Sequence, residues 1–392
     1  MTILEFMNRH GAAPEQINAR SALQQLLRDM EQGLAGKGNI PMLPSYLSAE
    51  GTVPAGKSCV VLDAGGTNLR TARAVFEADS SCRLEDLTKQ PMPGTEGELT
   101  AAELYEAMAE PVRRLGSFQQ VGFCFSYNVT LQRDLDGKLD FWCKEVRAPE
   151  AVGKPVGASL KAAIGSGCRA VHVLNDSVAA MLGAPGAQVG VILGTGVNVC
   201  YSERCESISK VPSDLKSKSM IISTEVGEFS GIPVSDFEAA VIAASDAPES
   251  ARAEKQCSGG YLGSVITAAW QTAAREGILP ERFRNQACDL ALVSQALAAG
   301  VQDDAMEIAR LAISRAARVA AILCAGPILR AGEKKPKVAV EGSQYWKLTG
   351  FREEFHRYLE QLLKPSGVSC EIIRSENACL IGAARAAFAE TM

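Results

Sequence analysis

The stretch Val60-Val61-Leu62-Asp63-Ala64-Gly65-Gly66-Thr67-Asn68-Leu69-Arg70 decides the fold of this chain. Its apolar start predicts a buried strand that ends at Asp63, and alternating residues from Asn68 onward predict a returning strand. The glycines between them predict a tight turn whose backbone N–H groups can approach an anion closely, with Thr67 and Asn68 as further donors. A carboxylate beside phosphate needs a cation between them, so Asp63 indicates Mg²⁺. The alternative is a plain β-hairpin in which Asp63 and Asn68 only serve the turn.

The composition is that of an ordinary globular chain of 392 residues, with 47% hydrophobic and 22% charged residues. This length suffices for two domains, each with its own core. The net charge is −5 and the chain has no long basic run, so we expect no nucleic-acid partner. Met1–His10 lacks the apolar core of a signal peptide, and runs such as 189–193 are too short to cross a bilayer. We therefore expect no membrane partner and a cytoplasmic location.

The twelve cysteines are scattered and include no Cys-x-x-Cys pair, and the three histidines lie far apart in sequence. A zinc site needs clustered ligands, so zinc is not expected. Several cysteines lie inside apolar runs, where cysteine behaves as a small hydrophobic residue. We expect reduced, mostly buried thiols and no nucleophilic triad.

Strand and helix signals alternate along the chain, which predicts an α/β fold. The spacing of leucines from Leu23 to Leu34 predicts a helix with Pro14 in its first turn. A second helix is expected at 100–115, kinked by Pro111. Later helices are expected at 177–182, 235–245, 261–277, 303–324, 349–363 and 378–389, and short buried strands at 121–125, 170–174, 338–340 and 371–373.

A second glycine turn repeats the logic of the first. Apolar strands at 189–193 and 198–201 flank Gly194-Thr195-Gly196. Two such hairpins facing each other across a cleft would hold a polyphosphate between them.

Polar residues stand where several predicted strands end, which is where ligands gather in α/β sheets. Asp176 has two interpretations, an N-cap of the following helix or a general base that takes a proton from a substrate hydroxyl. Carboxylates, amides and a hydroxyl together suit a sugar, whose hydroxyls both donate and accept hydrogen bonds. The candidate residues around Asp176 are Ser126, Asn175, Asn198, Glu225 and Glu254.

These motifs together resemble the hexokinase family, within the sugar kinase/actin/Hsp70 superfamily. Residues 63–70 match its first phosphate motif, 174–181 its segment with the catalytic aspartate, and 191–201 its second phosphate motif. Segments 224–229, 254–263 and 340–343 also fit in order. The chain is most similar to a short, single-unit hexokinase or glucokinase of bacterial type.

The resemblance implies two RNase H-like α/β domains, the actin-like ATPase fold, flanking a deep cleft. It implies a small domain of residues 52–174 plus 378–392 and a large domain of residues 1–51 plus 175–377. A monomer or homodimer is expected.

The resemblance also implies ATP-dependent phosphorylation of a hexose, with glucose as the default, at its 6-hydroxyl, giving hexose 6-phosphate and ADP. Asp176 would be the general base and Lys144 a second catalytic residue. The sugar would be held by Ser126, Cys143, Lys144, Asn175, Asp176, Asn198, Glu225 and Glu254. ATP would be held by Asp63, Gly65, Gly66, Thr67, Asn68, Arg70, Gly194, Thr195, Gly342 and Ser343, with Asp63 binding Mg²⁺ through water.

The chain departs from the family pattern at a few positions. Tyr127-Asn128 stands in place of Phe-Pro, and Cys143 in place of threonine; Ala378-Cys379 replaces Gly-Ser, and Glu341 replaces aspartate. These departures leave the preferred sugar and phosphoryl donor open. The alternative function is a sugar-sensing or sugar-binding regulator on the same fold with weak or no kinase activity. A third, an actin- or chaperone-like ATPase, would not need the residues around Asp176.

Overall fold

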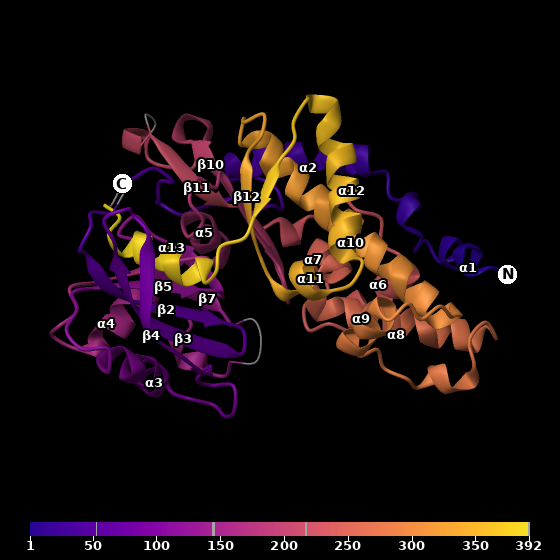
Figure 1. Ribbon diagram of the computed structural model, residues 1–392, viewed down its shortest axis with the longest axis horizontal. Coiled ribbons are helices and arrows are strands. Elements are labelled where there is room, and N and C mark those ends of the chain that lie inside the picture. Colours follow the sequence, from indigo (N-terminus) through magenta and orange to yellow (C-terminus); the bar gives the residue numbers. More distant parts are fainter. Residues whose placement is uncertain (52, 143–145, 216–217, 391–392) are drawn as a thin grey trace.

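Two β-sheets, one in each of two α/β domains, form the frame of the protein (Figure 1). The structure is a computed structural model that describes residues 1–51, 53–142, 146–215 and 218–390. Figure 1 places β2–β5 with α3, α4 and α13 in one lobe, and α6–α10 with α12 in the other. The two-domain α/β fold expected from the sequence is confirmed.

The first sheet has the strand order β4-β3-β2-β5-β8. β2 and β3 form an antiparallel hairpin, and β2, β5 and β8 run parallel to one another. The strands are β2 (Ser58–Gly65), β3 (Asn68–Phe76), β4 (Cys82–Pro91), β5 (Gln120–Phe125) and β8 (Ala170–Leu174). A separate two-stranded ribbon consists of β6 (Asn128–Leu131) and β7 (Gly137–Phe141).

Alternation along β2 buries both faces of this sheet. Val60 and Leu62 pack with residues of α3 (Ala101–Arg113) and α4 (Val156–Ile164). Cys59 and Val61 pack on the opposite face, against α5 (Asp176–Leu182) and α13 (Ala378–Ala387). Asp63 has the same parity as Cys59 and Val61, so the strand period directs its side chain to the face that α5 and α13 cover.

The second sheet has the order β1-β11-β10-β9-β12-β13. Its strands are β1 (Leu43–Pro44), β9 (Val189–Leu193), β10 (Val197–Arg204), β11 (Ser219–Ser223), β12 (Lys337–Glu341) and β13 (Glu371–Ile373). The helices of this part are α1 (Ile3–Arg9), α2 (Ala19–Leu34), α6 (Asp236–Ala243), α7 (Arg252–Cys257), α8 (Gly259–Arg275), α9 (Leu290–Ala298), α10 (Asp304–Arg330), α11 (Ser343–Lys347) and α12 (Phe351–Leu363).

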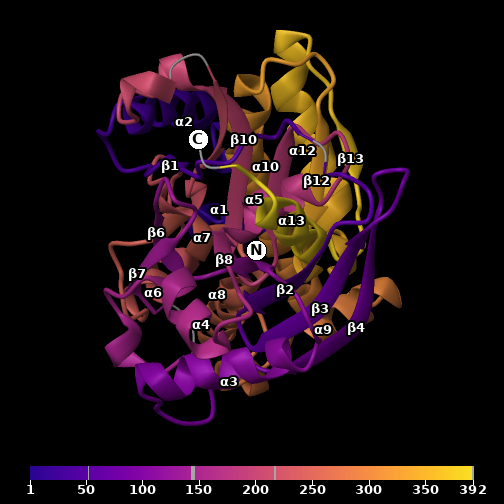
Figure 2. The same ribbon diagram turned by 90° about the vertical axis from the view of Figure 1, so that its left-hand side faces the viewer.

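Helices α5 and α13 lie between the two sheets (Figures 1 and 2). They cross closely because Gly382 has no side chain: a Cβ there would lie 1.9 Å from the carbonyl oxygen of Ala179. We propose that the domain boundaries lie where the sequence predicted them, 52–174 plus 378–392 against 1–51 plus 175–377. The contact between α5 and α13 then joins the two domains.

The apolar helix α10 runs through the core of the larger domain. It is long and apolar enough to cross a membrane, but 94% of its most apolar window is buried inside the protein, as in the core helix of a folded domain. The cysteines that the structure describes are all free and most are buried, as expected.

One prediction at the N-terminus is wrong, and one helix there was missed. Pro14 begins a separate 3₁₀ turn (Pro14–Gln16), and α2 starts only at Ala19, after Asn18, whose side chain accepts a hydrogen bond from the Ser21 N–H. Helix α1 was not predicted. Elsewhere the predicted helices and strands are present within about three residues of their expected ends, except that α10 continues six residues past Cys324 to Arg330; Pro111 lies inside α3.

Candidate active site

The first glycine turn joins β2 to β3 and is braced by a half-buried ion pair between Asp63 and Arg70. Gly66 has the left-handed backbone angle φ 53°, which glycine adopts at no steric cost. Asp63 and Arg70 are directly opposite across the hairpin, and Arg70 Nε donates to Asp63 Oδ2 at 2.9 Å. Burial lowers the pKa of Arg70, but the charge and hydrogen bonds of Asp63 outweigh this effect, and the net shift is upward. Asp63 is only 6% exposed, so the arginine neutralises a nearly buried carboxylate.

The second glycine turn joins β9 to β10 and is covered by the end of β12. Gly194 N–H donates to Gly196 O at 3.0 Å and closes the turn. Gly342 has φ 121°, and a Cβ there would lie 2.1 Å from the carbonyl oxygen of Leu193. A Cβ on Gly194 would lie 3.4 Å from Gly342 Cα and 3.8 Å from the backbone nitrogen of Ser343. The predicted ATP residues of the second turn and of the β12–α11 connection are therefore brought together.

A polar cluster lies beside this second turn. Asn198, 7% exposed, donates through Nδ2 to Glu225 Oε1 at 2.7 Å, to Ser223 Oγ at 3.0 Å and to Asn175 Oδ1 at 3.4 Å. The side-chain Oδ1 of Asn198 accepts from the backbone N–H of Glu225 at 3.1 Å. Three of the predicted sugar residues, which are far apart in sequence, are thus joined in one hydrogen-bonded group.

Glu225 is held in the left-handed backbone region, with φ 57°, which is uncommon for a non-glycine residue. Burial raises the pKa of Glu225 to about 7, and repulsion from Asp176 and Glu254 adds to the rise. Hydrogen bonds from Ser223 and Asn198 act in the opposite direction. Hydrogen bonds link the surroundings of all three carboxylates: Asn198 bonds both to Glu225 and to Asn175, which precedes Asp176, and Glu254 accepts from the N–H of Val197, which precedes Asn198.

Glu254, in the first turn of α7, is tied to the start of β10. Its Oε2 accepts from the backbone N–H of Val197 at 3.0 Å. A Cβ on Gly196 would lie 2.7 Å from the same carboxylate oxygen. The glutamate therefore contacts the residue that ends the second glycine turn, and it connects the polar cluster to that turn.

Asp176 is the first residue of α5, but it is not the helix cap. The N-cap is Asn175, whose Oδ1 accepts from Ser177 N–H at 2.8 Å, so the capping interpretation of Asp176 is wrong. Ser177 N–H also lies 2.8 Å from Asp176 Oδ1, which orients the carboxylate.

The surroundings of Cys379 locate Asp176 relative to the phosphate side. The hydrogen bond with Cys124 lowers the pKa of the Cys379 thiol, whereas burial and repulsion from Asp63, Glu341 and Asp176 raise it, and the net shift is upward. The Cys379 thiol lies 3.8 Å from the backbone oxygen of Asp176. Asp176 therefore follows Asn175 of the polar cluster in the chain and lies beside Cys379 of α13.

Ser126 stands at the first glycine turn. Its backbone N–H donates to Ala64 O at 3.1 Å, which extends the β2–β5 ladder by one residue. A Cβ on Gly65 would lie 3.9 Å from Ser126 Oγ and 3.7 Å from Asp63 Oδ1. The predicted sugar residues Cys143 and Lys144 lie outside the described residues.

The carboxylates of this site fit magnesium bound with few protein ligands. Among residues 1–51, 53–142, 146–215 and 218–390, no group of three or more histidine, cysteine, aspartate or glutamate side chains could enclose a metal. Mg²⁺ commonly takes one or two carboxylates together with waters and substrate phosphates. Asp63 beside the first turn meets that requirement.

Three residues that contact the site were not among the predicted site residues, although Tyr127 had been noted as a departure from the family pattern. Ser223 donates to Glu225 Oε1 at 2.7 Å. Its position at the end of a strand, two residues before Glu225, is the sequence feature that could have identified it. Tyr127 donates from its hydroxyl to Gly66 O at 3.0 Å. Asn377 Oδ1 accepts from Arg70 Nη1 at 3.4 Å, a contact across 307 residues of chain that no local pattern indicates.

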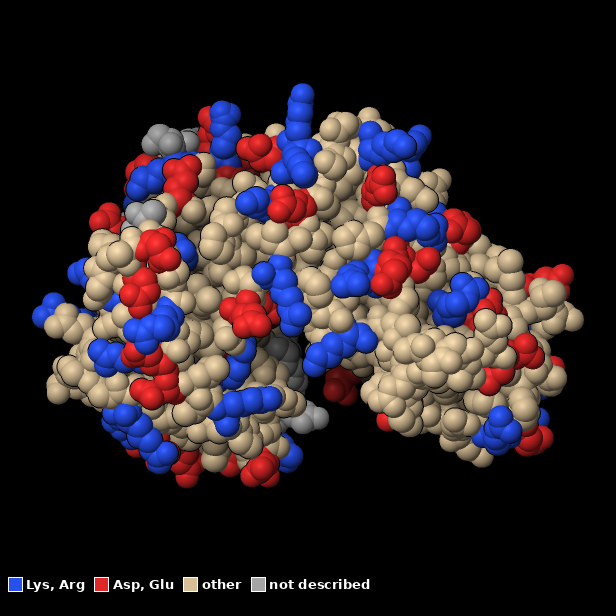
Figure 3. Space-filling view, viewed as in Figure 1, with Lys and Arg blue, Asp and Glu red and all other residues tan. Residues whose placement is uncertain are grey.

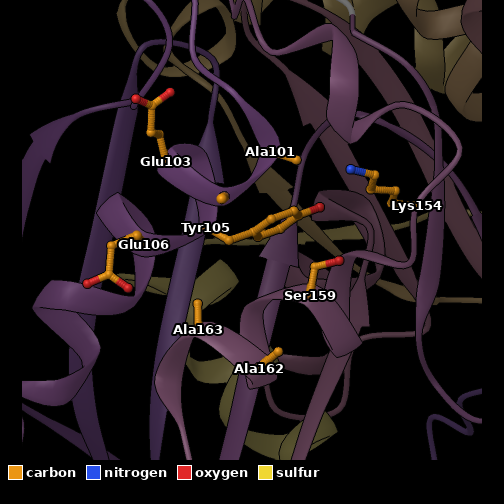
Figure 4. Close-up of a pocket in the computed structure, with 9 residues that line it drawn as sticks. Ala101, Glu103, Tyr105, Glu106, Lys154, Ser159, Ala162 and Ala163 are labelled. Carbon is orange, nitrogen blue, oxygen red and sulfur yellow. The ribbon is translucent and has the colours of Figure 1, made fainter.

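The surface is hollowed between the two lobes (Figure 3). A different depression, of about 620 Å³, lies between α3 and α4. Figure 4 shows Tyr105 in it, with its hydroxyl on the side of Ser159 and Lys154. None of the predicted site residues that the structure describes lines this pocket.

The fold and the two glycine turns define a two-domain kinase of the sugar kinase/actin-like class. Comparison with known families agrees, because two family models, both described as hexokinase, match residues 5–185 and 188–389. The chain belongs to the hexokinase family, and it is a hexokinase by enzyme class.

Individual relatives and structures are similar along most of the chain. "Hexokinase-2, chloroplastic" of Nicotiana tabacum is 28% identical over 93% of this chain and 85% of its own length. The structure titled as hexokinase from Schistosoma mansoni complexed with glucose has a TM-score of 0.82 at 23% identity, covering 98% of this chain and 97% of that one. A ROK family glucokinase from Streptomyces griseus in complex with glucose and AMPPNP has a TM-score of 0.51 at 18% identity, covering 84% of this chain and 99% of that one. These two structural similarities support the fold.

Proposed function

We propose that this hexokinase transfers the terminal phosphoryl group of ATP to the 6-hydroxyl of a hexose, with glucose as the default, and that Asp176 is the general base. One observation carries the proposal. Asp176 directly follows Asn175, which bonds to Asn198 in the polar cluster, and its backbone oxygen lies 3.8 Å from the thiol of Cys379, in the helix α13 that packs on the Asp63 face of β2. A base in that place can meet a sugar hydroxyl on one side and a phosphoryl group on the other.

Asp176 would accept the proton of the attacking hydroxyl as the oxygen bonds to phosphorus. Phosphoryl transfer needs mainly positioning and charge neutralisation, and an aspartate that receives the hydroxyl proton is its usual base. The hydrogen bond from Ser177 N–H fixes one carboxylate oxygen, and the cap made by Asn175 fixes the start of the helix. Lys144 is proposed as the second catalytic residue.

The polar cluster would hold the sugar. Glu225 and Glu254 accept hydrogen bonds from sugar hydroxyls, while Asn198 and Asn175 can both donate and accept. Ser126, at the first turn, would hold the sugar from the smaller domain, together with Cys143 and Lys144.

The two glycine turns would hold ATP. Backbone N–H groups at Gly65, Gly66, Thr67 and Asn68 would approach the phosphates, with Arg70 adding positive charge. Gly194 and Thr195 would contact the phosphates from the larger domain, and Gly342 and Ser343 would lie near the adenosine. Mg²⁺, held through water by Asp63, would neutralise charge on the phosphates.

The test is a panel of hexoses with ATP and Mg²⁺, in which ADP release and the phosphorylated product are both measured. The proposal expects sugar-dependent ADP release, a 6-phosphate product, and no turnover with 6-deoxyglucose, which lacks the accepting hydroxyl. Sugar binding by calorimetry with no turnover on any hexose would instead establish the alternative function, a sugar-sensing regulator.

A cytoplasmic location and a monomeric or homodimeric state complete the proposal. Gel filtration with light scattering tests the second point, and a trimer or larger assembly would contradict it. The chloroplastic name of the tobacco relative belongs to that protein alone.

A further inference from the structure

The side chain of Tyr127 connects the sugar-side segment to the first glycine turn. Its hydroxyl donates to the carbonyl oxygen of Gly66 at 3.0 Å, and the residue is 3% exposed. The family pattern has phenylalanine at this place, so the hydroxyl bond is a feature of this chain.

The tyrosine ring is fixed on both sides. It packs against Phe125 with ring centroids 4.9 Å apart, and edge-on against Trp142 at 5.0 Å. Trp142 is itself anchored, because its indole N–H donates to Ala148 O at 2.7 Å. Aromatic pairs of this kind hold a side chain in one place, so the hydroxyl is a fixed donor.

The carbonyl that it meets belongs to the peptide unit between Gly66 and Thr67. In a trans peptide the C=O and the N–H point in opposite directions. A carbonyl held toward the aromatic cluster therefore directs the Thr67 N–H away from that cluster, toward the open side of the turn. Without a partner this peptide has freedom to rotate, since Gly66 can adopt both positive and negative φ.

We infer that Tyr127 is a positioning residue for the nucleotide: its hydroxyl fixes the Gly66–Thr67 peptide so that the Thr67 N–H is already aimed at a phosphate of ATP. The inference rests on the proposed function in one respect, the binding of ATP phosphates at this turn. The inference gives the sugar no role in the hydrogen bond between Tyr127 and Gly66. The neighbouring predicted sugar residue, Ser126, is held separately, by its own N–H to Ala64 O.

The test is Tyr127→Phe, which removes one oxygen and keeps the ring. A neutral hydrogen bond contributes roughly 2- to 10-fold to an equilibrium of this kind. We expect the KM for ATP and the Kd for ADP to rise by about that factor, with the KM for hexose within about twofold of wild type. The matched control is Tyr105→Phe, a tyrosine of α3 in the same domain that is 4% exposed and bonded to Ser159 rather than to the turn.

Thermal melting of both variants separates a loss of folding from a loss of positioning. Equal rises in both KM values, or unchanged ADP binding in a folded Tyr127→Phe protein, would overturn the inference. If the wild type phosphorylates no hexose, the proposed function fails, but calorimetry with ADP still decides whether Tyr127 positions the nucleotide. If the wild type is active and the variant binds ADP normally, only the inference fails.

Discussion

Replacing Glu225 with glutamine tests the electrostatics of the sugar site without a change of shape. Glu225 Oε1 accepts hydrogen bonds from Ser223 Oγ and Asn198 Nδ2, each at 2.7 Å, and a glutamine carbonyl oxygen can accept both. The substitution therefore removes the charge and leaves the donors paired. What changes is the cost of burying an ionised carboxylate.

The size of that cost follows from the pKa of Glu225, which burial raises from 4.5 to about 7. A raised carboxyl pKa means that the folded protein favours the protonated form of Glu225. The stability that this protonated side chain contributes is fully present below pH 4.5 and is lost as the pH rises through about 7. At about 1.4 kcal/mol per pH unit, the ionised side chain costs about 3 kcal/mol at pH 8 and under about 1 kcal/mol at pH 5. Glu225→Gln does not incur this cost.

Urea unfolding at the two pH values measures the effect. The glutamine variant should be more stable than wild type by roughly 2–3 kcal/mol at pH 8, and the difference should shrink by about 2 kcal/mol at pH 5. The matched control is Glu333→Gln, an exposed glutamate in the loop between α10 and β12, for which no difference is expected. A stability difference for Glu225→Gln that is the same at both pH values would refute the reasoning.

Two further predictions follow from the site. The KM for hexose should rise by up to about tenfold as the pH falls from about 8 to about 6, because fewer Glu225 side chains are then ionised to accept hydrogen bonds from sugar hydroxyls. Steady-state kinetics measures this, and a KM that does not change with pH would contradict a role for ionised Glu225 in sugar binding. Gly342→Ala should lower the free energy of unfolding in urea by about 3–5 kcal/mol, since its Cβ would lie 2.1 Å from Leu193 O. The control Gly350→Ala, also at positive φ but in open space, should lower it by only about 1–2 kcal/mol. Equal losses of stability would argue against the close packing of Gly342 on the second turn.

Local patterns in the sequence predicted the elements that carry their own signal. The two glycine hairpins, the strand before Asn175 and the apolar stripes of α2 and α12 all follow from periodicity and turn residues. Helix α1 was missed because it is only seven residues long, although Thr2 and Glu5 form a capping box that marks its start.

Contacts between distant parts of the chain could not be predicted in the same way. Asn198 and Glu225 were both expected at a sugar site, but their direct bond depends on the left-handed backbone of Glu225, which no glycine marks. The pairing of Arg70 with Asn377, and of Tyr127 with Gly66, depends on how sheets and helices pack.

The central claim is that Asp176 is the base for phosphoryl transfer to a hexose. Its most direct test is the kcat of Asp176→Asn with the preferred hexose, compared with wild type and with Asp304→Asn, an exposed aspartate that likewise begins a helix after an Asx N-cap. General base catalysis contributes about 10²–10⁴-fold, so Asp176→Asn, and equally Asp176→Ala, should lose that much kcat while ADP binding and the Asp304→Asn rate stay near wild type. An Asp176→Asn enzyme within a few-fold of wild type would contradict the assignment.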